Sequence, residues 1–162
     1  MKHFKLFEQF INESKEPVVK YAERINKEGE LTQKQKEDFT HNVNASGAEL
    51  QAAKQYIKDL MAWKSDNEVH DKLKDNTLNY LEALVKGNEA YLKSYQAAEK
   101  GNITQAEKAI VEYRKIEKTF NDYYNNGKKI KKQAGMNLGS QNPWEDKLGS
   151  LADKIKSTHS TL

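Results

Sequence analysis

The chain contains no cysteine. This absence excludes a disulfide framework, a thiolate zinc site, a cysteine nucleophile and a lipid anchor attached to cysteine. Proline and glycine are scarce, with two and eight residues among 162, which excludes a collagen-like or low-complexity protein. A chain of this length and composition fits one globular domain.

The chain also lacks a strong charge of one sign and a long apolar run. The 27 basic residues nearly balance the 24 acidic ones, and the net charge is +3. Arginine, the usual reader of phosphate and guanine, occurs only at Arg24 and Arg114, so sequence-specific DNA binding is not expected. No apolar run approaches the roughly 18 residues of a membrane span, and the opening MKHFKLFEQFI has no small-residue cleavage site. We therefore expect a soluble chain without a secretory signal.

Three sites along the chain carry the signals of a helix start. In a capping box, Ser or Thr and a Glu or Gln three residues later satisfy two amides that the first turn leaves unpaired. The predicted boxes are Thr32 with Gln35, Ser65 with Glu68, and Thr104 with Glu107. Gly29 and Gly101 precede two of these boxes and can end the preceding helix in the left-handed conformation.

Between these boundaries, apolar residues recur at alternating steps of three and four, which is typical of helices in a bundle. The inward positions include Val43, Leu50, Ile57, Leu73, Leu81, Leu84, Ile103, Ile110 and Phe120. Polar residues interrupt the core pattern at Ser46, Thr77, Asn88 and Glu117, where they are expected to fix helix register.

A fourth apolar face lies near the N-terminus, at Val18, Tyr21, Ala22 and Ile25. Because proline inside a helix costs about 3 kcal/mol, we expect Ser14 to cap a new helix with Pro17 in its first turn. The prediction is an all-α fold: an antiparallel up-down-up-down four-helix bundle over residues 14–134. Helices of roughly 30 residues make it about 45 Å long.

Residues 135–162 are predicted to be a linker followed by a short amphipathic helix. Trp144, Leu148, Leu151 and Ile155 share one stripe of that helix. The stripe is expected either to dock back on the bundle or to hold a protein partner.

No catalytic, cofactor or metal site is predicted. A di-iron bundle needs Glu-x-x-His pairs on facing helices, and the sequence has none. The histidines, His3, His41, His70 and His159, are expected on the surface. The carboxylates fall mostly on polar faces, and there is no phosphate-binding loop, nucleophile elbow or zinc motif.

Two other clusters have a structural and a functional interpretation. Lys128, Lys129, Lys131 and Lys132 gather four charges into five residues. They offset the negative end of a helix, or they form a weak, non-specific polyanion patch. A stripe of tyrosines is either core or the lining of a groove, and it comprises Tyr91, Tyr95, Tyr113, Tyr123 and Tyr124.

The N-terminal peptide MKHFKLFEQFINESK concentrates aromatic and aliphatic residues ahead of Pro17. It resembles the capsid-targeting peptides of internal and scaffold-core head proteins of large tailed phages, which begin Met-Lys and end in a Phe-Ile-x-Glu type sequence. In that family a prohead protease cuts after the glutamate of an Ile/Leu-x-Glu triplet. The matching residues here are Phe10, Ile11, Asn12 and Glu13.

The resemblance implies a cut between Glu13 and Ser14. It implies that Phe7, Phe10 and Ile11 anchor the protease or scaffold, that capsid or scaffold proteins are the partners, and that the protein resides in the virion or the host cytoplasm. One alternative is that residues 3–13 are extra helical turns packed on the bundle. Another is a cytoplasmic adaptor that grips its partner through the Trp144 stripe.

Overall fold

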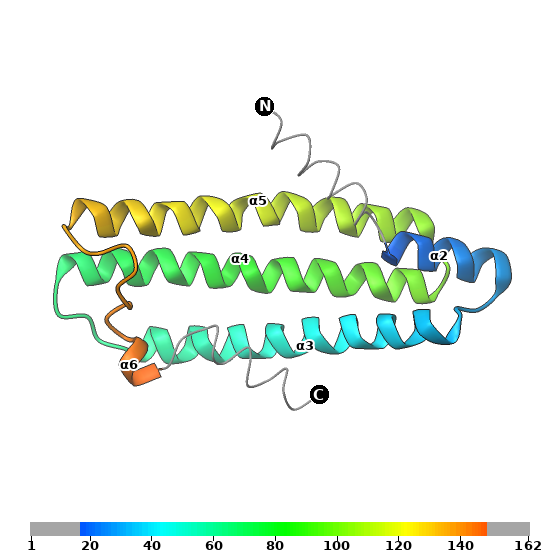
Figure 1. The fold of residues 1–162 in the computed structure, drawn as a ribbon, viewed down its shortest axis with the longest axis horizontal. Coiled ribbons are helices and arrows are strands. Elements are labelled where there is room, and N and C mark those ends of the chain that lie inside the picture. The colour runs from blue at the N-terminus through cyan, green and yellow to red at the C-terminus, as the bar shows by residue number, and fades with distance from the viewer. Residues whose placement is uncertain (1–16, 149–162) are drawn as a thin grey trace.

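The computed structural model describes residues 17–148, and these residues form an all-α bundle without strands. Its helices are α2 (Pro17–Glu28), α3 (Gln33–Ala62), α4 (Glu68–Glu99), α5 (Ile103–Gln133) and α6 (Glu145–Leu148). Successive long helices run in opposite directions, as Figure 1 shows. The predicted all-α, up-down-up-down bundle is confirmed.

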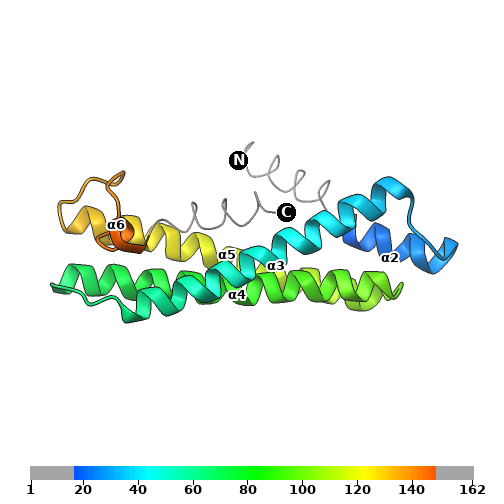
Figure 2. The same cartoon turned by 90° about the horizontal axis from the view of Figure 1, so that it is seen from below.

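Helix α4 lies at the centre of the bundle. It packs against α3 on one side and α5 on the other, and it also contacts α2 (Figures 1 and 2). The described part of α2 has 12 residues, whereas α3, α4 and α5 have 30, 32 and 31. The described part of α2 therefore covers only one end of the α4–α5 pair.

The buried side chains form two clusters at opposite ends of α4. One cluster joins α2, α4 and α5 and includes Val18, Tyr21, Ala22, Tyr95, Ala98, Ala106 and Ile110. The other joins α3, α4 and Trp144 and includes Ala53, Tyr56, Leu60, Leu73, Leu81 and Leu84. We call them the α2 cluster and the Trp144 cluster.

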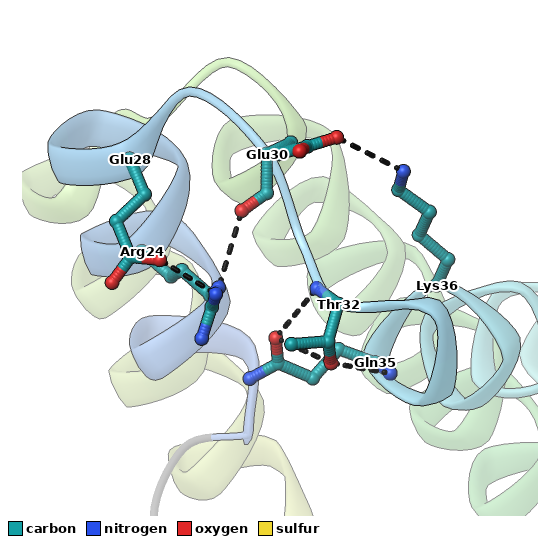
Figure 3. A network of polar contacts seen from close by, with 6 residues as sticks. All are labelled: Arg24, Glu28, Glu30, Thr32, Gln35 and Lys36. Carbon is teal, nitrogen blue, oxygen red and sulfur yellow. Dashed lines mark hydrogen bonds and ion pairs between the residues drawn. The ribbon is translucent and has the colours of Figure 1, made fainter.

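The turn between α2 and α3 contains the predicted capping box (Figure 3). The amide of Gln35 donates to Thr32 Oγ1 at 3.3 Å, and the amide of Thr32 donates to Gln35 Oε1 at 3.0 Å. Arg24 pairs with Glu28 at 2.6 Å, and its Nε donates to the carbonyl of Glu30 at 3.2 Å. Gly29 ends α2 with a positive φ of 80°, as predicted.

The other two predicted boxes are wrong. Helix α4 begins one residue after Asn67, whose side chain accepts from the amide of His70 at 2.9 Å. Helix α5 begins one residue after Asn102, whose side chain accepts from the amide of Gln105 at 3.0 Å. Asparagine caps a helix as well as serine and better than threonine, and in both places it is the asparagine that takes the cap.

The buried polar residues agree only in part with the prediction. Ser46 and Asn88 are buried as expected, while Thr77 and Glu117 are partly exposed. Asn76 is a buried residue that the sequence pattern does not indicate. Its Nδ2 donates to the carbonyl of Tyr123 at 3.0 Å, and its Oδ1 accepts from Asn126 Nδ2 at 2.8 Å. Asn76 therefore ties the first third of α4 to the last third of α5.

Candidate functional site

The segment after α5 turns back across the end of the bundle. Gly135 has a φ of 69°, and the amide of Met136 donates to the carbonyl of Lys131 at 2.9 Å, which closes the helix. Lys131 Nζ donates to the carbonyl of Ser140 at 2.7 Å and holds the segment against α5. The chain then crosses from α5 to α3, where α6 lies (Figure 1).

The returning segment places Trp144 in the core of the bundle. Its side chain is fully buried in the Trp144 cluster, beside Tyr56 and Leu60. Its ring meets that of Trp63 in a T-shaped arrangement, with centroids 5.5 Å apart. The indole thus fills an end of the bundle that the described part of α2 does not reach.

The predicted partner face is corrected at Trp144, because a fully buried indole offers no surface to a partner. Leu148 packs on the same cluster, and Leu151 and Ile155 lie outside the described residues. Of the two alternatives for this stripe, docking on the bundle holds for its first half. Within residues 135–148, Trp144 is buried in the bundle, and Met136 and Leu148 pack against the same cluster. The physical reason is the apolar surface of α3 and α4 at this end of the bundle, which Trp144 covers.

A cavity of about 240 Å³ opens beside Trp144. Its walls come from all three long helices and from the returning segment, and include Tyr56, Asn76, Tyr80, Tyr123, Lys128 and Trp144. Burial raises the pKa of Tyr80, and the charge of Glu49 raises it further. Burial also raises the pKa of Tyr56, and the neighbouring Trp144 indole opposes that rise. The indole N–H of Trp144 has no well-aligned hydrogen-bond acceptor within residues 17–148. The contact with Tyr56 therefore satisfies this N–H only weakly.

The mouth of the cavity exposes an aromatic ring beside a lysine. Tyr124 is 59% exposed and Leu138 is 52% exposed. Lys128 Nζ lies 4.2 Å from the centroid of the Tyr124 ring, which is a cation–π contact. We call Tyr124, Lys128 and Leu138 the cavity mouth.

The predicted lysine cluster lies at the end of α5, next to this mouth. Lys128 and Lys131 line the cavity. Lys132 follows Lys128 by one turn on the same side, and Lys129 is turned about 100° away. Lys131 is held by its hydrogen bond to the carbonyl of Ser140, whereas the side chains of Lys129 and Lys132 are exposed. The cluster therefore divides into one structural lysine and three at the surface.

The tyrosine stripe divides between the two ends of the molecule. The rings of Tyr91, Tyr95 and Tyr113 pack together near the α2 cluster, with centroid distances of 5.0 and 5.2 Å from Tyr91 to the other two. Burial raises the pKa of Tyr113 to about 12 and that of Tyr95 further. Tyr123 and Tyr124 line the cavity instead. The stripe is core at one end and cavity wall at the other.

The predicted targeting residues, Phe7, Phe10, Ile11, Glu13 and Ser14, lie outside the described residues. The predicted surface histidines divide: His41 is exposed, while His70 is partly buried and pairs with Asp66 at 2.8 Å. Within residues 17–148, no cluster of three or more His, Asp or Glu side chains is placed to hold a metal ion. None of the helices in that range has an apolar stretch that could cross a membrane.

Comparison with known protein families, curated proteins and solved structures finds no match to this chain.

Proposed function

We propose that this chain is a non-enzymatic helical-bundle interaction protein of a phage head, carried into the assembling shell by residues 1–13. The observation that carries the proposal is the position of the Ile11-Asn12-Glu13 triplet relative to the bundle. Helix α2 begins at Pro17, and Val18 and Val19 are already buried. A cut between Glu13 and Ser14 would leave every described core residue in place.

The burial of Trp144 favours this function over the adaptor. An adaptor that grips its partner through the Trp144 stripe must first release the indole from the Trp144 cluster. Exposing a buried aromatic side chain of this size costs several kcal/mol. Residues 1–13 precede the described core residues in the sequence, so their removal takes none of those residues out of the core.

The test is the intact mass of the protein recovered from its natural source. We expect the mass of Ser14–Leu162, and we expect a Glu13→Gln variant to keep its N-terminal peptide because the cleavage determinant is lost. If the wild-type protein has the mass of a chain that begins at Met1 or Lys2, the proposal is overturned. Residues 3–13 would then be favoured as part of the bundle.

A further inference from the structure

The end of α5 presents positive charge that the bundle does not neutralise. Within residues 17–148, none of the ion pairs involves Lys128, Lys129, Lys131 or Lys132. The C-terminal end of α5 carries only about half a unit of negative charge, which neutralises a small part of the positive charge of these four lysines. Glu145 is the carboxylate in the cavity wall, and it accepts from Asn142 Nδ2 at 2.8 Å.

The same surface presents the ring of Tyr124, which lies on the side of α5 that carries two of the lysines. Tyr124, Lys128 and Lys132 follow one another at steps of four and lie on one side of α5. The contact between Lys128 and Tyr124 is exposed and therefore weak, so an anion can draw the ammonium away from the ring at little cost. The ring then has a face open to a planar group.

The size of the cavity limits what the planar group can be. At about 240 Å³ it is smaller than the roughly 300–1,000 Å³ of sites that enclose a drug-sized ligand. One flat ring fits against Tyr124 and Leu138, and the rest of the ligand must stay outside, along the lysines.

We propose that the cavity mouth binds single-stranded nucleic acid, with one base stacked on Tyr124 and the adjoining phosphates paired with Lys128 and Lys132. Stacking on aromatic side chains beside a basic track is how proteins bind single strands without reading their sequence. The scarcity of arginine agrees with this mode, since it requires no bidentate contact to a base edge. The site does not depend on residues 1–13, and the two proposals can fail separately.

The test measures binding of a fluorescein-labelled 12-nucleotide oligothymidylate to the full chain by fluorescence anisotropy. We expect binding that weakens as salt rises. Lys128→Gln and Lys132→Gln should each reduce the log–log slope of that salt dependence, by roughly 0.7 for every phosphate that the variant no longer pairs. Tyr124→Leu should weaken binding at least about fivefold, and Tyr124→Phe should retain it because the aromatic face remains.

Two further variants give matched controls. Lys118→Gln removes a lysine of α5 that lies away from the cavity, and it should leave affinity unchanged. Glu145→Gln removes the opposing negative charge and should tighten binding. The circular dichroism of each variant checks that the bundle is folded.

Three results would overturn the proposal. Equal affinity of Tyr124→Leu and the wild type would show that no base stacks on the Tyr124 ring. Equal affinity for a 12-base-pair duplex would reduce the interaction to general attraction for polyanions. Thymidine monophosphate that binds as tightly as the strand would assign the cavity mouth to free nucleotides.

Discussion

At the scale of single residues, Trp144 has the largest expected effect on stability. It is fully buried in the Trp144 cluster and packs on Trp63. Truncation to alanine should therefore lower the free energy of unfolding by about 3–5 kcal/mol. Urea unfolding followed by circular dichroism measures the change. Leu138→Ala, at a half-exposed site of the same segment, should stay within about 0.5 kcal/mol of the parent. A loss under about 1 kcal/mol for Trp144→Ala would show that the segment is not docked in solution.

Two glycines inside helices make a matched pair. A Cβ at Gly87 in α4 would lie 2.7 Å from Phe120 Cζ of α5, whereas a Cβ at Gly47 in α3 would meet nothing within 4 Å. Gly47→Ala should raise the free energy of unfolding by about 0.5–1 kcal/mol, because alanine favours the helix. Gly87→Ala should lower it by up to about 2 kcal/mol, because overpacking outweighs that gain. Chemical denaturation of both variants gives the signs, and a stabilising Gly87→Ala would contradict the close approach of α4 and α5.

At the same scale, the errors of sequence interpretation have physical causes. The capping-box pattern points to Ser65 and Thr104, although Asn67 and Asn102 are the residues whose side chains cap the two helices. The burial of Asn76 is not predictable from the apolar stripe, because Asn76 lies off it and is held by Asn126 and the carbonyl of Tyr123. Periodicity along one helix cannot report such a contact between two helices.

At the scale of elements, aromatic rings join α2 to the long helices. Tyr21 of α2 lies 5.9 Å from Phe39 of α3 and 6.5 Å from Tyr95 of α4, measured between ring centroids. Tyr91 links this group to Tyr113 of α5. Four helices therefore meet through one set of rings, and burial raises the pKa of three of them, Tyr21, Tyr95 and Tyr113.

These raised pKa values predict how stability changes in alkali. A tyrosine in the unfolded chain loses its proton near pH 10, whereas burial raises the pKa of Tyr113 in the bundle to about 12. The folded state keeps the Tyr113 proton to a higher pH than the unfolded chain does. The contribution of Tyr113 to the free energy of unfolding is therefore complete below about pH 10 and falls as the pH rises through 12.

The variant Tyr113→Phe cannot ionise and should lose stability less steeply over that range. Urea unfolding at several pH values between about 9 and 12 measures the slope. Tyr124→Phe changes an exposed ring and should keep the slope of the parent. Equal slopes for all three proteins would contradict the burial of the Tyr113 hydroxyl.

The elements themselves are predictable to different degrees. Helices α3, α4 and α5 follow from long amphipathic stripes, since such stripes must be buried against one another in a bundle. The position of Trp144 in the core cannot be predicted from its stripe, because an apolar stripe identifies one face of a helix and not the surface that covers this face. The cavity is unpredictable for the same reason: Tyr56, Tyr80 and Tyr123 belong to different helices, and only packing brings them together.

At the scale of the whole molecule, α4 is shared by both buried clusters. Its central amides, between Leu81 and Tyr95, should exchange with solvent more slowly than any in α3 or α5, because both ends must open to free them. Hydrogen exchange followed by mass spectrometry tests this order. In Trp144→Ala, exchange should rise around Leu60 and Leu73 more than around Ala106. A uniform rise would show that the two clusters open as one unit.

The burial of Trp144 also bears on the order in which the bundle forms. Pairing of α3 with α4 and of α4 with α5 joins neighbours in sequence, and such local pairing is fast. Trp144 must instead reach Tyr56 and Leu60 across α4 and α5, at a larger loop-closure cost. The helical hairpins should therefore assemble first. On the ribosome, the nascent bundle leaves Tyr56, Leu60 and Leu73 uncovered until the segment that carries Trp144 has emerged.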